Sequence, residues 1–138
     1  MYKRQTRKDY YSGLLQVSKE GNWNNWLVYF LSGVARQAED ALSRAERINQ
    51  LLIKWRLDTA GTSLPNQLID HLAGNPFITV KKIVEIFHVA PTTVQRAIDK
   101  LEKLGVLSLE RDVKRNRVYC AKELLNILEE PANLVVMV

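Results

Sequence analysis

The sequence of 138 residues contains a single cysteine, Cys120. One thiol cannot form an internal disulfide or supply a thiolate metal site, so both are excluded. A lone cysteine in a strand is most often a small buried hydrophobe, which is how we interpret Cys120. No apolar run approaches the roughly 18 residues of a membrane helix, and no apolar core of a secretory signal follows the basic N-terminus. We therefore expect a cytoplasmic chain with no membrane partner.

Catalytic motifs are also missing. Only two histidines occur, His71 and His88, and the patterns HExxH, G-x-x-x-x-G-K and GxSxG do not appear. We interpret both histidines as packed or solvent-facing side chains rather than as ligands or bases. On its own residues the chain is predicted not to be an enzyme, and to use no cofactor and no metal.

Positive charge is what the sequence has in excess. The formal net charge is +5 and the isoelectric point about 9.4, which permits nucleic-acid binding without establishing it. Residues 1–60 carry ten basic and six acidic side chains, and residues 61–138 carry ten and nine. The excess therefore lies mainly in the first part of the chain.

Residues 58–65, DTAGTSLP, form the strongest interruption of the helical pattern, and we place a domain boundary there, between 1–60 and 61–138. The first part predicts two helices. Gly21 ends the first of them, Asn22 begins the second, and an apolar repeat of three and four residues continues to about residue 58. A capping-box pattern at Thr6 suggests the start of the first helix.

The long second helix carries more apolar surface than two helices can bury. The side chains that need a partner are Trp23, Trp26, Phe30 and Trp55. Two interpretations remain open: these residues pack against the second domain, or they bind a partner, which is another copy of the chain or an upstream domain.

The second part predicts helices at residues 64–73, 80–87 (capped by Thr79) and 91–104, in which Leu104 is buried and which Gly105 ends. Strands at 106–109 and 117–120 form a hairpin, and a helix at 121–130 closes the chain. This is the order of a winged helix-turn-helix. The predicted fold class is mainly α: a helical hairpin with one long helix, followed by a winged helix-turn-helix domain with a small β-hairpin wing.

A DNA reader of this kind uses the outward face of the third helix and the wing. On the helix the candidates are Thr92, Thr93, Gln95, Arg96 and Lys100, and on the wing they are Lys114, Arg115 and Arg117. Gln95 could pair with an adenine edge and Arg96 with guanine or phosphate. An ordinary solvated helix also carries such residues, and Asp99 opposes phosphate. DNA binding and a role in protein interaction therefore both stay open.

A family resemblance covers most of the chain. The first part contains Tyr10 and Tyr11 followed by the segment GNWNNWLVYFLSGV, which begins at Gly21, and the second contains KRNRVY within its wing. This combination resembles the C-terminal part of bacterial proteins of the Fic family, in which a winged helix follows the end of the Fic core.

The resemblance implies a function that the chain does not carry by itself. Fic proteins typically transfer AMP from ATP to a hydroxyl of a target protein, with an HxFx(D/E)GNGRxxR loop that this sequence lacks. No residue here inherits a catalytic role, and the chain resembles a piece of a longer protein or a truncated reading frame. We expect a non-catalytic regulatory and targeting module of such a transferase, whose partners are duplex DNA, the upstream Fic catalytic domain and a second copy bound through the long helix. The main alternative is a protein-interaction or dimerisation module that binds no nucleic acid, and a third interpretation is a free-standing transcription factor whose long helix makes the dimer.

Overall fold

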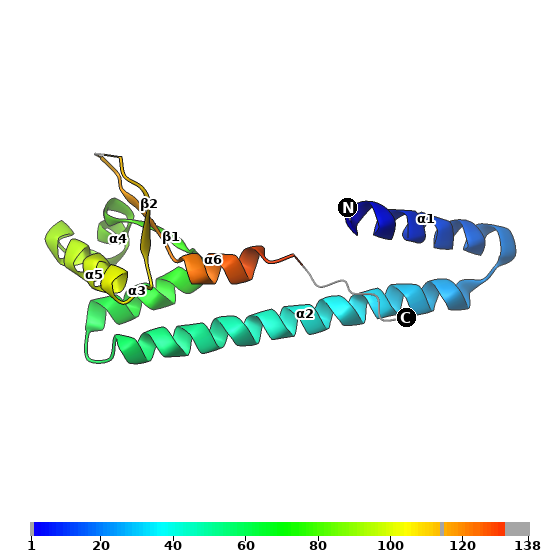
Figure 1. Cartoon of the computed structure of the whole chain (residues 1–138), viewed down its shortest axis with the longest axis horizontal. Helices are drawn as coiled ribbons and strands as arrows, with labels where there is room; N and C mark the ends of the chain where they lie inside the picture. The colour runs from blue at the N-terminus through cyan, green and yellow to red at the C-terminus, as the bar shows by residue number, and fades with distance from the viewer. Residues whose placement is uncertain (1, 114, 132–138) are drawn as a thin grey trace. The chain divides into compact units, whose positions relative to one another are not determined.

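The computed structural model describes residues 2–113 and 115–131. Figure 1 shows the elements, which are α1 (Tyr2–Glu20), α2 (Trp23–Asp58), α3 (Ser63–Gly74), β1 (Phe77–Thr79), α4 (Val80–Phe87), α5 (Pro91–Lys103), β2 (Ser108–Arg111), β3 (Val118–Cys120) and α6 (Lys122–Glu129). The predicted fold class is confirmed: the chain is mainly helical, and a winged helix-turn-helix follows one long helix.

The contacts divide the chain into two compact units, one that includes the residues up to Leu42 and one that spans Ser43–Pro131. The boundary between the units lies inside α2, because the second half of that helix packs with the winged helix. The domain boundary that the sequence suggested, between 1–60 and 61–138, stays a prediction.

In the first unit, α1 folds back along the beginning of α2. Gly21 adopts a φ of 62°, its N–H bonds to the carbonyl of Val17 at 3.0 Å, and the side chain of Asn22 accepts from the N–H of Asn25 at 3.5 Å. Gly13 leaves room for Trp26, because a Cβ at that position would lie 3.0 Å from Trp26 Cδ1 and the indole would have to shift. The predicted ends at Gly21 and Asn22 are confirmed. The predicted start at Thr6 is wrong, since α1 already begins at Tyr2.

The second unit has one hydrophobic core, to which the last turns of α2 contribute. Leu52 and Trp55 of α2 are buried there, with Trp55 only 2% exposed. The other members come from α3, α4, α5, the sheet and α6; they include Leu68, Ile69, Leu72, Ile83, Ile98, Leu101, Val106, Tyr119 and Leu124. The end of α2 is therefore structurally part of the winged helix.

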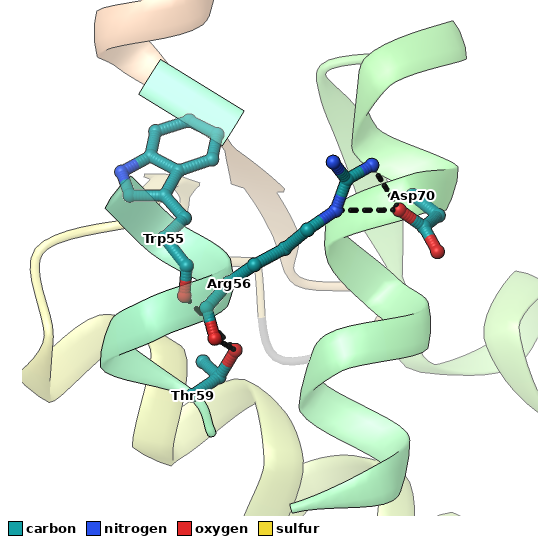
Figure 2. Close-up of polar contacts among 4 residues, drawn as sticks. All are labelled: Trp55, Arg56, Thr59 and Asp70. Atoms are coloured by element: carbon teal, nitrogen blue, oxygen red, sulfur yellow. Dashed lines mark hydrogen bonds and ion pairs between the residues drawn. The ribbon is translucent and has the colours of Figure 1, made fainter. Parts of the chain in front are cut away.

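A short turn with its own hydrogen bonds connects α2 to α3, and Figure 2 shows the side chains around it. The buried hydroxyl of Thr59 donates to the carbonyl of Trp55 at 2.9 Å, which uses a carbonyl at the end of α2. The guanidinium of Arg56 reaches Asp70 on α3, with Nε at 3.1 Å and Nη2 at 2.6 Å from Oδ1. These contacts connect the end of α2 with the turn and with α3.

Helices α4 and α5 begin as the sequence predicted. The hydroxyl of Thr79 accepts from the N–H of Lys82 at 3.2 Å and caps α4, and Pro91 occupies the first turn of α5. Between the helices, His88 takes a φ of 54°, in the left-handed region, and its N–H bonds to the carbonyl of Val84. The predicted burial of Leu104 is wrong. This residue lies just after α5 and is 40% exposed, because the chain already turns there toward Gly105.

The sheet has three antiparallel strands in the order β1-β3-β2, one more than the sequence predicted. Strand β1 pairs with β3, placing Phe77 opposite Cys120, and β2 pairs with the other side of β3. The predicted hairpin is confirmed, although β2 begins at Ser108 rather than at Val106, whose side chain is buried. Cys120 is fully buried, as predicted.

Candidate nucleic-acid interface

Helix α5 presents one buried side and one open side. Val94, Ala97, Ile98 and Leu101 face the core and are at most 5% exposed. The helical repeat consequently turns Thr92, Arg96 and Asp99 to solvent, and all three are exposed. Gln95 and Lys100 lie at the two margins of this open side and are half-buried. The structure thus brings the five predicted helix residues together on one surface, with Thr93 beside Lys100.

Gln95 is held by two neighbours. Its Nε2 donates to Asp99 Oδ1 at 2.8 Å, one turn further along α5, and to the hydroxyl of Tyr119 on β3 at 3.3 Å. The ring of Tyr119 is buried. The side chain of Gln95 is therefore oriented before any ligand arrives, a feature that sequence reasoning missed because Tyr119 is 24 positions away.

At the opposite margin, Lys100 lies next to the turn before α3. Its Nζ donates to the hydroxyl of Thr62 at 3.3 Å, and that hydroxyl donates to the carbonyl of Thr59 at 2.7 Å. A shallow depression of about 400 Å³ is lined here by Thr62, Ser63, Thr93, Arg96 and Lys100, among others. The side chains of Arg96 and Lys100, together with the first residues of α3, make this depression suitable for a phosphate group.

The wing supplies further basic side chains. Arg115 and Arg117 are exposed, and Arg117 Nε lies 3.1 Å from Asp112 Oδ1. Asn116 between them adopts a φ of 68° and makes the turn. Lys114, the remaining predicted wing residue, lies outside the described residues. The hairpin is irregular between Leu109 and Arg111, where the register with β3 shifts.

A groove of about 550 Å³ connects the wing with the helices. Val80 and Val84 of α4, Pro91 of α5 and the Arg117 side chain line it, together with Gln95. Lys81 also lies there, in the first turn of α4, and is exposed. Sequence reasoning did not single out Lys81; the adjacent pair Lys81 and Lys82 at a helix start was the available signal.

The charge of this surface is mixed rather than uniformly positive. Asp99 stands among Thr92, Arg96 and Lys100 on the open side of α5, and Glu110 of β2 pairs with Lys122 of α6 at 3.7 Å. Such a surface provides both donors and acceptors, which base edges require, as well as cations for phosphates.

The four residues expected to bind a partner do not all lie in the same unit, since Trp23, Trp26 and Phe30 belong to the first unit and Trp55 belongs to the second. Trp23 and Phe30 are 59% and 46% exposed, and Trp26 stacks on Phe30 with ring centroids 5.3 Å apart. The indole N–H of Trp26 has no hydrogen-bond partner among the described residues. Trp55 is different: it is buried in the core of the second unit, so the expectation that it would serve a partner is corrected and the intramolecular alternative holds for it.

The two histidines lie in α3 and in the turn between α4 and α5. His71 is half-buried edge-on to Phe87, with ring centroids 6.3 Å apart, and His88 is exposed in its turn. In the part of the chain that the structure describes, no group of three or more His, Cys, Asp or Glu side chains could hold a metal ion. Within the same residues, no helix is long and apolar enough to cross a membrane.

Comparison with known families gives a match to part of the second unit. Residues 66–108 match the family model described as winged helix-turn-helix DNA-binding, a segment that begins in α3 and ends at the start of β2. A search of curated proteins returned no match for the chain. The comparison therefore supports the winged helix, and it provides no link to the Fic family.

Proposed function

We propose that the winged helix binds duplex DNA, with the open side of α5 in the major groove and the wing against the backbone. The match of residues 66–108 to a DNA-binding family supports this function most directly. The positions of Thr92, Thr93, Gln95 and Arg96 in the first turns of α5 suit contacts with base edges, because recognition helices use their N-terminal residues. Arg115 and Arg117 of the wing suit phosphates, as does Lys114.

Binding to random duplex DNA, followed by fluorescence anisotropy over a salt series, tests this function. We expect binding that weakens steeply as salt increases, with a slope of about −0.9 for each phosphate contact. A variant in which Arg96, Arg115 and Arg117 are all changed to Ala should bind more weakly and show a shallower slope. Changing Lys19, Arg36 and Lys54 to Ala removes the same charge from α1 and α2 instead of from α5 and the wing, and it provides the matched control. No binding at low salt would contradict the proposal.

The exposed apolar residues of the first unit favour a second function, that of a partner-binding surface. Residues Leu27, Val28, Phe30 and Leu31 follow one another around α2 and are all between 42% and 65% exposed. A helix that is apolar on all sides is normally buried. We propose that this surface, together with Trp23 and Trp26, packs against another domain or against a second copy through the long helix.

Both activities fit a non-catalytic regulatory and targeting module, and we retain the hypothesis that the parent protein is a bacterial Fic-type AMP transferase acting in the cytoplasm. The motif in residues 21–34 and the adjoining winged helix support it. Adding an upstream Fic catalytic domain in trans should produce a stable complex, detectable by light scattering after size exclusion. A chain that stays monomeric at high concentration would contradict the second-copy version, and failure to bind the Fic domain would contradict the other.

A further inference from the structure

The hydrogen bonds of Gln95 determine which polar atoms α5 presents to a ligand. The atom next to Asp99 must be the amide nitrogen, because a carboxylate only accepts hydrogen bonds. Both contacts of that nitrogen are made within the chain, to Asp99 at 2.8 Å and to Tyr119 at 3.3 Å. An amide nitrogen has two hydrogens, so neither remains for a ligand.

Only acceptors are therefore left at this position. Gln95 retains its carbonyl oxygen, and Asp99 retains its second carboxylate oxygen and the unused lone pairs of the first. Asp99 is exposed on the open side of α5, so its acceptors face the region that a major groove would occupy. With both hydrogens used in this way, Gln95 lacks the donor for a bidentate pair with adenine, because that pair requires the amide to donate to N7 while it accepts from N6.

We propose that Gln95 and Asp99 together read the amino group of a cytosine in duplex DNA. In the major groove cytosine presents only a donor, its N4 amino group, whereas guanine presents two acceptors, thymine one acceptor, and adenine a donor beside an acceptor. A site with acceptors alone attracts the cytosine edge and repels the acceptors of the other bases. The inference rests on the proposed function of DNA binding, which it refines to one base preference.

Arg96 suits the other half of the same base pair. It follows Gln95 directly and lies one turn before Asp99 on the exposed side of α5. Its guanidinium has donors only, and guanine offers the acceptors O6 and N7. The order of acceptors and donors on α5 thus matches a C·G pair.

Selection from a pool of randomised duplexes, with the whole chain, tests the inference. We expect one position of the selected site to require cytosine, with a preference of about tenfold over the other bases in competition binding. Asp99→Ala frees the amide of Gln95, so the preference at that position should move from cytosine toward adenine. Asp99→Asn keeps an acceptor for Gln95 but adds an outward donor, and it should remove the advantage of cytosine over guanine and thymine.

Glu102→Ala is the matched control, because it removes one negative charge from the same helix at an exposed position without a contact to Gln95. It should leave the base preference unchanged. If the chain selects a site, yet both Asp99 variants retain the same preference at every position, the cytosine inference is overturned while DNA binding stands. If no duplex is bound at low salt, both fail. The helical circular dichroism of each variant verifies that the unit remains folded.

Discussion

Lys100 of α5 donates from Nζ to the hydroxyl of Thr62, 3.3 Å away in the turn before α3. The same hydroxyl donates to the carbonyl of Thr59, whose own hydroxyl bonds to the carbonyl of Trp55. Hydrogen bonds through Thr59 and Thr62 therefore connect the end of α2 with the candidate recognition helix. The position of the ammonium group depends on this chain of contacts.

We predict that Lys100→Ala weakens DNA binding without altering base preference. The ammonium beside Arg96 lines the depression suited to phosphate, and loss of one phosphate contact reduces the salt slope by about 1. Anisotropy titrations at several salt concentrations measure the slope. Lys54→Ala, an exposed change on α2, should leave it unaltered. An unaltered slope in Lys100→Ala would exclude Lys100 from the phosphate contacts.

Thr62→Val separates the orientation of Lys100 from its charge. The ammonium remains, but its hydroxyl partner is removed. We predict a smaller loss of affinity than for Lys100→Ala, with the full salt slope retained, because the charge can still meet the phosphate from other rotamers. The same titrations test this. A slope as shallow as that of Lys100→Ala would show that the hydroxyl itself is needed at the phosphate.

We predict that Trp55→Ala destabilises the second unit by about 3–5 kcal/mol, because the indole is buried in the core of that unit and its removal leaves a cavity. Urea unfolding, followed by circular dichroism at low protein concentration, measures the free energy of unfolding. Ile53→Ala is the control on the same helix, since Ile53 is 47% exposed. Equal effects of the two changes would contradict the placement of Trp55 in the core.

Local sequence signals predicted most of the helices. Thr79 as a cap and Pro91 in a first turn act within a few residues, so their effects are readable without a fold. Strand β1 was missed because three residues carry no periodic pattern, and its pairing partner β3 lies some 40 positions later. The exposure of Leu104 was missed for a similar reason: the helical repeat continues to that residue although the chain turns there.

The sequence predicted which side chains share the open side of α5, but not the contacts that these side chains make. The helical period places Thr92, Arg96 and Asp99 on one side of α5. It does not reveal that Tyr119 holds Gln95 or that Thr62 meets Lys100, because these pairs are 24 and 38 positions apart. The pairing of Gln95 with an adenine edge stays a prediction, and the contacts with Asp99 and Tyr119 that bear on it could not be read from the sequence.

Cys120 should be unreactive in the folded protein. It is fully buried, and burial raises the pKa of its thiol, so the nucleophilic thiolate is both scarce and inaccessible. If reaction requires unfolding that costs about 5 kcal/mol, an aromatic disulfide reagent should react roughly 5 × 10³-fold more slowly than in urea. Absorbance of the released thiol measures both rates. A fast reaction without denaturant would show that β3 opens locally.

The carboxylate of Glu130, just after α6, bonds to both terminal nitrogens of Arg47 on α2, with Nη2 to Oε1 at 2.8 Å. The hydrogen bonds from Arg47 hold the pKa of Glu130 below its ordinary value. The folded value is thus lower than the unfolded one, so the stabilising contribution is complete above the ordinary glutamate range and is lost as pH falls through the lowered value. We predict that the attachment of α6 to α2 weakens in acid, by a small amount because the pair is exposed.

An NMR titration of the Glu130 side chain measures this, with Arg47→Gln as the comparison. In the variant the pKa of Glu130 should rise toward its ordinary value. The additional loss of hydrogen-exchange protection of the α6 amides at low pH should disappear. Arg44, which donates to the carbonyl of Leu128 at 3.0 Å, still holds the end of α6 in that variant, so the helix should remain folded. An identical titration in both proteins would mean that the ion pair does not persist in solution, and that apolar contacts of α6 such as those of Leu124 hold it alone.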